Sequence, residues 1–423
     1  PLAVITHSPS LPIDAPEASM NCSATVFSGS PAKRWRKCSL QPISKPQLAG
    51  CSGAMAMPRC CSSSTHAPSD PSLAQLPPPN EHRLYVADVT IQHIVDNRLH
   101  VIDGERFRYL GQFAAGYAGQ ATLSRDRKEL YLATTYFARL SRGERSDVVE
   151  VHDPATLSLI AEIPIPPRRA QALPYEGLMR TSVDGRWLFI QNATPSTSIT
   201  VVDLKARKFA AEIPNPACWI VIPSETTANR FSTICGDGAL QTMILNDDGT
   251  LKSSTRSERF FDPGNDPIYV QTQNIGDRHV MVSFHGKVYV ADLSGETPRI
   301  EAPWSLLGKA DAKPGWRPGG YQLFAVHRGQ QRLYIGMHKG GAEGTHKNPA
   351  DEIWVFDLQS RKRVARLPGH AAVAMVVTQS ARPTLYALDA VKMAIAKFSV
   401  GDKPRFAGRM EGVAESATML ELH

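Results

Sequence analysis

The 423-residue sequence contains no apolar run near the roughly 20 residues that a membrane-spanning helix needs. Aromatic residues make up only 7% of the chain and do not interleave with a basic stripe, which argues against a nucleic-acid partner. The net charge of +7 is spread along the chain. G-x-S-x-G, H-E-x-x-H and Walker A motifs are all absent, so the common nucleophile-elbow, zinc-protease and phosphate-loop sites are not indicated.

Cysteine is scarce after residue 61. Residues 1–80 are rich in Ser, Pro and Ala, lack hydrophobic periodicity, and hold Cys22, Cys38, Cys51, Cys60 and Cys61. Such a segment cannot bury enough apolar surface to offset its ordering entropy, so we expect a disordered or non-native N-terminal extension. The spacing of its cysteines fits no known zinc finger. Pro1 in place of Met, without a clear signal segment, predicts a processed, partial or mis-started chain.

The two remaining cysteines, Cys218 and Cys235, fall at the start and the end of two neighbouring predicted strands. Antiparallel neighbours at that offset can bring their Cα atoms within disulfide range, and buried free thiols are the alternative. A bond closing about 17 residues stabilises the fold by about 3 kcal/mol in the chain-entropy model. Because disulfides persist in oxidising compartments, this bond favours a periplasmic location.

What the chain does have is a repeated pair of short strands. The first strand of each pair begins near Arg83, Glu129, Arg186, Asn229, Asp277, Gln331 and Pro383, and the second near Leu99, Val148, Ile199, Leu240, Lys287, Glu352 and Ala394. Strand-only repeats about 42 to 65 residues apart are typical of β-propellers. We therefore expect residues 81–423 to form an all-β, seven-bladed β-propeller of four-stranded antiparallel blades. The C-terminal strand near residues 416–422 should close the ring and remove an open sheet edge.

Acidic and histidine residues do not form a predicted catalytic or metal site. Carboxylates recur at one point of each repeat, which indicates turn capping rather than acid/base chemistry: Asp103, Asp153, Asp203, Asp292 and Asp357. No Cys or carboxylate stands at metal-ligand spacing from His327, His338 or His346. We expect no catalytic residue and no metal on this chain.

Several long stretches carry a family resemblance: residues 134–151, 191–199, 218–223, 233–238, 303–307, 316–323 and 344–355. On the basis of these stretches, the chain from about Arg83 to His423 resembles the heavy (large) subunit of the tryptophan-tryptophylquinone amine dehydrogenases. It looks more similar to the aromatic amine (aralkylamine) dehydrogenase than to the methylamine dehydrogenase heavy chain. The resemblance covers none of residues 1–80.

The resemblance implies a periplasmic heterotetramer of two heavy and two light subunits. The tryptophan tryptophylquinone cofactor would belong to the small light subunit, where primary amines are oxidised to aldehyde and ammonia. Electrons would pass on to a blue-copper protein. The isolated chain is expected to be inactive, because such chemistry belongs to the cofactor.

The resemblance also points to particular residues. The family places an aromatic side chain at the mouth of the substrate channel, and this sequence has Ile91 at the matching place. An aliphatic wall cannot stack on an aromatic ring, a difference of about 0.5–1.5 kcal/mol. The loop residues Arg139, Arg142 and Arg145 are candidates for the subunit interface, with solvated loop charges as the alternative. A stand-alone, lactonase-like propeller enzyme and a non-catalytic interaction propeller remain open. A neighbouring gene for a small light subunit would decide among the three.

Overall fold

The computed structural model describes residues 76–171, 174–401 and 403–423. Within these ranges the chain forms strands and three short 3-10 helices, η1 (Ile91–His93), η2 (Lys309–Asp311) and η3 (Thr345–Lys347). None of the described helices is long and apolar enough to cross a membrane. The extension predicted for residues 1–80 lies almost wholly outside the described residues, so its disorder stays a prediction.

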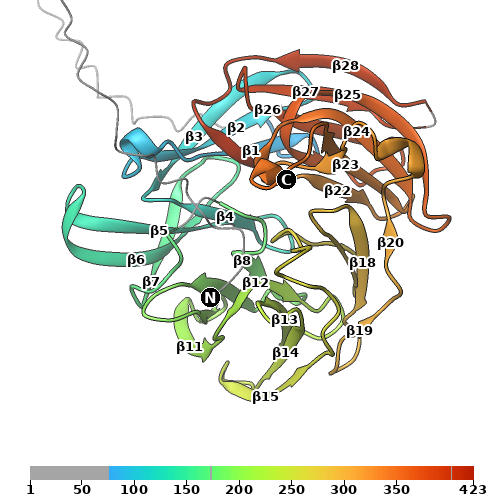
Figure 1. Ribbon diagram of the computed structural model, residues 1–423. Coiled ribbons are helices and arrows are strands. Elements are labelled where there is room, and N and C mark those ends of the chain that lie inside the picture. The colour runs from blue at the N-terminus through green and yellow to red at the C-terminus, as the bar shows by residue number, and fades with distance from the viewer. Residues whose placement is uncertain (1–75, 172–173, 402) are drawn as a thin grey trace, which may run out of the picture. The chain divides into compact units, whose positions relative to one another are not determined.

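The described strands form six antiparallel sheets, which Figure 1 shows arranged around a common centre. The first sheet contains, in hydrogen-bonded order, β29 (Ala417–Leu422), β1 (Arg83–Asp88), β2 (Asn97–Asp103) and β3 (Arg108–Gly116). The second contains β4 (Gln120–Leu123), β5 (Leu130–Arg139), β6 (Arg142–His152) and β7 (Leu159–Ile165). The third contains β8 (Met179–Thr181), β9 (Trp187–Asn192), β10 (Ser198–Asp203) and β11 (Lys208–Pro214). The fourth and fifth contain β12 (Cys218–Pro223), β13 (Arg230–Cys235), β14 (Leu240–Leu245) and β15 (Leu251–Arg256); and β16 (Gln273–Ile275), β17 (Arg278–Val282), β18 (Lys287–Asp292) and β19 (Arg299–Ile300), with β20 (Trp304–Ser305) also paired to β18.

The sixth sheet differs from the others in size. It has eight strands: β21 (Arg317–Pro318), β23 (Arg332–His338), β24 (Ala350–Asp357), β25 (Lys362–Val377), β26 (Thr384–Asp389), β27 (Ala394–Ser399) and β28 (Arg405–Met410), with β22 (Phe324–His327) paired to β23. The prediction of seven separate four-stranded blades is therefore wrong. The chain forms five blade-like sheets of a propeller and one curled eight-stranded sheet.

The physical reason for the difference is the 16-residue strand β25. Its first part pairs with β24 and its second part with β26, so two expected blades share one hydrogen-bonded ladder. Pro368-Gly369 looks like a turn signal in the sequence. Instead, the strand bends there and continues, with His370 and Ala371 at φ 47° and 52°. The pairing of β25 with both β24 and β26 is irregular at this point. Such a bulge changes the direction of a strand without ending it.

The C-terminal strand pairs with the first strand of the chain, as the sequence predicts. β29 runs antiparallel to β1, from Leu84 opposite Leu422 to Asp88 opposite Ala417. Leu420 is fully buried, and its backbone N–H and C=O both bond to the side chain of Gln322, at 2.9 and 3.0 Å. The chain end is thus tied to the first sheet and to a connection of the sixth.

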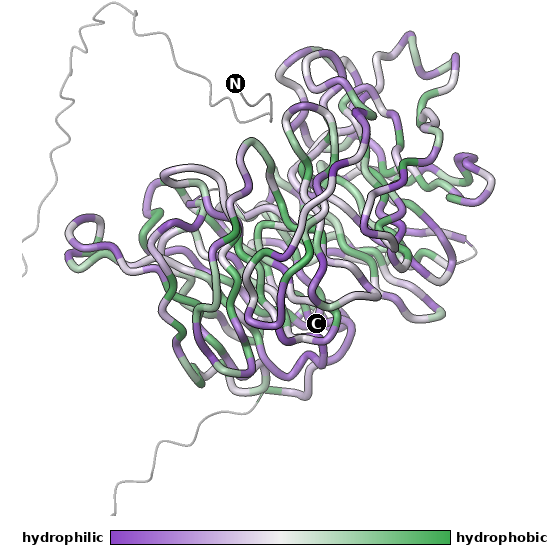
Figure 2. The backbone as a smooth tube through the Cα atoms, turned by 90° about the horizontal axis from the view of Figure 1, so that it is seen from below, coloured by the Kyte–Doolittle hydropathy of each residue, from purple (hydrophilic) through white to green (hydrophobic). Residues whose placement is uncertain are grey.

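The core lies between neighbouring sheets. Figure 2 shows apolar residues concentrated along the strands and polar residues at the connections between them. The third and fourth sheets, for example, meet around Phe189 and Phe231, whose ring centroids are 4.8 Å apart. Burial of such aromatic side chains contributes a large part of the stability of a fold that has little local helix.

The recurring aspartates cap turns after the third strand of a repeat, as predicted. Each accepts a hydrogen bond from a backbone N–H two or three residues further on, which satisfies a donor of the tight turn. These bonds, all between 2.6 and 3.0 Å, run from Glu105 to Asp103, Ala155 to Asp153, Ala206 to Asp203, Ser294 to Asp292 and Ser360 to Asp357.

A disulfide joins Cys218 of β12 to Cys235 of β13. The two residues lie directly opposite each other in the ladder, and both are buried. The bond closes the open end of this strand pair, where the first strand begins and the second ends.

Candidate functional site

Two connections of adjacent sheets lie at the same end of the ring of sheets. Residues 89–96 join β1 to β2, and residues 140–141 join β5 to β6. Both link the second and third strands of sheets that pack against each other, and antiparallel order puts equivalent connections at one end. We call the surface formed by residues 89–96 and 136–146 the hairpin face.

The loop that carries Ile91 is tied to the C-terminal segment through Asp88. The Asp88 carboxylate accepts hydrogen bonds from the backbone N–H groups of Glu415 (2.9 Å) and Ser416 (2.8 Å), and lies 3.1 Å from His100 Nε2. Burial alone would raise the pKa of Asp88, but these hydrogen bonds outweigh burial and lower it. A charged Asp88 thus fixes the start of this loop.

Ile91 itself lies on the surface. It opens η1, and 70% of the residue is exposed. The buried side chain of Asn97 closes the loop behind it, accepting a hydrogen bond from Thr90 N–H (2.9 Å) and donating one to the carbonyl of Ile94 (2.6 Å). A large apolar side chain is therefore presented to the outside on a well-anchored loop.

The β5–β6 hairpin projects beyond its sheet, as Figure 1 shows. At its tip Arg139 and Arg142 lie opposite each other in the register, and both are exposed. Leu140, between them, is 74% exposed. Because like charges placed directly opposite each other are unfavourable, an acidic partner would stabilise this tip.

Arg145 has a different role from the other two arginines. Its Nε and Nη2 atoms bond both oxygens of Asp147, at 2.8 and 2.6 Å. The Asp147 side chain is fully buried, whereas Arg145 is mostly covered. Arg145 therefore supports the base of the hairpin and does not extend from it.

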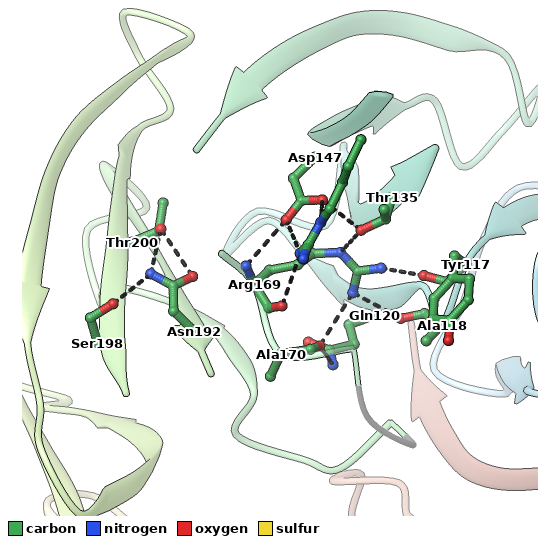
Figure 3. Close-up of polar contacts among 11 residues, drawn as sticks. Tyr117, Ala118, Gln120, Thr135, Asp147, Arg169, Ala170, Asn192, Ser198 and Thr200 are labelled. Atoms are coloured by element: carbon green, nitrogen blue, oxygen red, sulfur yellow. Dashed lines mark hydrogen bonds and ion pairs between the residues drawn. The ribbon is translucent and has the colours of Figure 1, made fainter. Parts of the chain in front are cut away.

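A buried arginine completes this base, as Figure 3 shows. Arg169 is 1% exposed, and its guanidinium donates to Thr135 Oγ1 (2.9 Å), to the carbonyl of Ala118 (2.9 Å) and to the carbonyl of Tyr117. Thr135 Oγ1 in turn donates to Asp147 (2.7 Å). Burial lowers the pKa of Arg169 to about 10 despite the opposing charge of Asp147, so the group stays cationic at neutral pH. These hydrogen bonds join both strands of the hairpin, β5 and β6, to Arg169 in the connection between β7 and β8.

Sequence reasoning missed Arg169 and Asp147. Arg169 follows Pro166 and Pro167, a composition that indicates only a loop, and its acceptors lie 34 to 52 residues earlier in the chain. The one local signal in the sequence is the charge of Asp147 directly before the apolar residues Val148 and Val149. The loop expected around Arg139, Arg142 and Arg145 is a strand hairpin: Arg139 ends β5, Arg142 and Arg145 lie in β6, and only residues 140–141 form the turn. The disulfide belongs to the fourth sheet.

His327, His338 and His346, which the sequence analysis considered as metal ligands, are not grouped with other potential ligands among the described residues. Among the described residues, no group of three or more His, Cys, Asp or Glu residues is placed to hold an ion. His327 is buried and held by Ser380 O (3.0 Å) and Gln330 N–H (3.0 Å), which is a structural role.

The ring of antiparallel sheets places this protein among the β-propeller-type folds, and its hairpin face is a surface feature held in place by buried polar contacts. Solved structures share the fold: putative 6-phosphogluconolactonases from Bacteroides fragilis and Bacteroides uniformis are 12% and 10% identical to it, each with a TM-score of 0.57. Each alignment covers 81% of this chain, and 97% and 100% of those chains. At such low identity the likeness concerns the fold alone.

Sequence comparison is more specific. The family model of the methylamine dehydrogenase heavy chain matches residues 80–406. The methylamine dehydrogenase heavy chains of Methylobacillus flagellatus and Paracoccus versutus are each 30% identical to this chain, over 316 and 325 residues. These alignments cover 74% and 76% of this chain, and 78% and 75% of the relatives. The chain belongs to the methylamine dehydrogenase heavy chain family, and is thus a heavy subunit of an amine dehydrogenase.

Proposed function

We propose that this chain docks a small quinone-bearing light subunit on its hairpin face and forms part of the wall of the substrate channel there. The observation that carries this proposal is the anchored hairpin with its exposed Arg139, Leu140 and Arg142, at the same end of the ring of sheets as the exposed Ile91. Exposed apolar side chains that gather on one surface within a polar rim mark interaction sites, and both Leu140 and Ile91 belong to the hairpin face. In this assembly two heavy and two light subunits form a periplasmic heterotetramer that passes electrons to a blue-copper protein.

The reaction that we propose is the oxidation of a primary amine, with aromatic (aralkyl) amines preferred. The amine loses two electrons and two protons to the quinone of the light subunit, water supplies the aldehyde oxygen, and ammonia leaves. The tryptophan tryptophylquinone supplies the electron-accepting chemistry, and protein groups orient the substrate and exclude water around it. On this chain Ile91 supplies an apolar wall.

Trp316 and Trp354 belong to the packing of this chain. Their ring centroids are 5.1 Å apart, and at 2% and 0% exposure they lie within one hydrophobic cluster. On the proposed division of labour, this chain positions the light subunit and encloses the substrate.

Co-expression tests the proposed function. The chain would be produced with and without its light subunit, and amine-dependent dye reduction would be measured with benzylamine and methylamine. We expect activity only in the complex, because the electron acceptor belongs to the partner. Amine oxidation by the isolated chain would contradict the proposal, and so would the absence of any complex between the two subunits.

The substitution Ile91→Phe tests the role of this residue in substrate choice. In the complex, we expect it to raise kcat/KM for benzylamine relative to methylamine by about 1–2 kcal/mol in differential transition-state binding, because a ring can stack on an aromatic substrate. The matched control is Val364→Phe, which adds a ring to an exposed aliphatic position on β25. An unchanged substrate ratio in Ile91→Phe, or the same change in the control, would show that Ile91 does not line the channel.

A further inference from the structure

A second site lies on the axis of the ring of sheets, at the end opposite the hairpin face. A cavity of about 320 Å³ is lined by residues of the innermost strands β4, β8, β12 and β16, by Glu421 of β29 and by Arg328, which follows β22. It reaches the turns that connect first strands to second strands, such as residues 124–127. Antiparallel order puts those turns at the end opposite the connections of the hairpin face.

Charged side chains of both signs meet in this cavity, although they are far apart in the sequence. Four arginines, three glutamates and one histidine line it. Two of the glutamates are neutralised locally: Arg125 Nη1 lies 3.1 Å from Glu225 Oε2, and Arg180 forms an ion pair with Glu176. These pairs leave Arg127, Arg328 and Glu421 as the groups that decide the charge of the cavity.

The balance of these three groups is positive. Burial raises the pKa of the Glu421 carboxyl, which favours its neutral, proton-donating form. Arg127 uses one Nη atom to bond the carbonyl of Leu422 (2.7 Å). Arg328 is exposed and lines the cavity, and its guanidinium forms no hydrogen bond with another described residue. An arginine side chain stays protonated at neutral pH. Two guanidiniums and one carboxyl group therefore remain, so these three groups carry a net positive charge in either protonation state of Glu421.

His279 is a buried polar group in the wall of this cavity. It lines the cavity and is 4% exposed, yet neither ring nitrogen has a hydrogen-bond partner among the described residues. Leaving a buried polar group unsatisfied costs about 1–3 kcal/mol, so such groups are usually explained by something that binds them. Burial lowers the pKa of His279 to about 4, so the ring is neutral at pH 7 and offers one N–H donor.

We propose that this axial cavity binds a small oxyanion, either phosphate or a carboxylate, between Arg328 and Arg127, with the neutral His279 in the cavity wall. Guanidinium groups form strong, charge-assisted and often bidentate hydrogen bonds with such anions. The volume of about 320 Å³ is at the lower end for ligand pockets and limits the ligand to a small molecule. A cation is disfavoured because Glu176 and Glu225 already pair with arginines. This site is separate from amine oxidation, so it stands whether or not the proposed function holds.

Calorimetric titration of the full chain tests the site. Inorganic phosphate and malonate are titrated separately at constant ionic strength in chloride buffer, which distinguishes a phosphate ligand from a carboxylate ligand. We expect saturable one-to-one binding of at least one of them to the wild type. Arg328→Ala should weaken it about ten-fold or more, the usual effect of losing a hydrogen bond from a charged group. Arg328→Lys should bind more tightly than Arg328→Ala but less tightly than the wild type, because lysine keeps the positive charge but lacks the paired N–H donors of the guanidinium.

The matched control is Arg299→Ala, which removes an exposed arginine from β19, away from the cavity. It should bind the anion as the wild type does. The proposal is overturned if neither anion binds in the millimolar range, or if Arg328→Ala and Arg299→Ala bind with the wild-type affinity. Neither result would bear on the light subunit, since the titration involves no amine and no quinone.

Discussion

Replacing Asp147 by asparagine should lower the free energy of unfolding by about 3–5 kcal/mol, the range for breaking a buried ion pair on one side. Asparagine keeps the shape of the side chain but removes its charge. Arg145 then loses a bidentate partner, and the cation of Arg169 stays buried with only neutral acceptors. The backbone N–H of Arg169, which now donates to Asp147 (3.1 Å), also loses a charged acceptor.

Chemical denaturation followed by circular dichroism measures this effect. The matched control is Glu144→Gln, which removes a carboxylate from the exposed part of the same hairpin and should change stability by less than about 0.5 kcal/mol. A second variant, Asp147→Asn combined with Arg169→Met, should be less destabilised than expected from the single changes, because it removes both buried charges together. A loss below about 1 kcal/mol in Asp147→Asn would show that the network does not hold the hairpin.

The same change has a functional consequence under the proposed function. The network connects β5 and β6 to the connection that contains Arg169, so its loss frees the projecting hairpin. A partner surface that must first be ordered binds more weakly, because binding then has to offset the entropy of ordering. Weaker association with the light subunit is thus expected in Asp147→Asn even at temperatures where the chain stays folded.

Local patterns predicted the strands and turns well, but not how the strands divide into sheets. The aspartates that cap turns act within two or three residues of themselves, so sequence spacing identifies them. The continuous strand β25 depends instead on which strands pair across a bend at His370 and Ala371, two non-glycine residues with positive φ. Positive φ is uncommon outside glycine, and the sequence gives no sign of it here.

The candidate site shows the same division. The exposed position of Ile91 could be predicted because polar composition indicates a loop, and loops lie on the surface. Arg142 is exposed as expected, but it lies in strand β6 and not in a loop. Arg145 and Arg169 could not be told apart from solvated loop arginines, because their roles depend on carbonyls and carboxylates brought in by the fold. The axial cavity is the extreme case, since its lining residues extend from Thr122 to Glu421 and converge only when the ring closes.

Ring closure by β29 leads to the other large effect: deletion of residues 416–423 should make the chain insoluble or remove most of its stability. The strand buries Met419 and Leu420, and burial of two such side chains is worth about 3–6 kcal/mol against a total of about 5–15 kcal/mol for a typical domain. Deletion also breaks the ladder with β1 and the bonds between Leu420 and Gln322. The exposed edge of β1 would then be free to pair with other chains.

A point variant keeps this prediction testable if the truncated chain cannot be purified. Leu420→Ala, at a fully buried position, should cost about 2–5 kcal/mol, whereas Leu422→Ala, at a half-buried position in the same strand, should cost clearly less. Thermal unfolding and size-exclusion chromatography of both variants supply the measurement. A soluble, monomeric deletion variant with an unchanged unfolding temperature, or equal effects of the two alanine substitutions, would mean that β29 does not secure the first sheet.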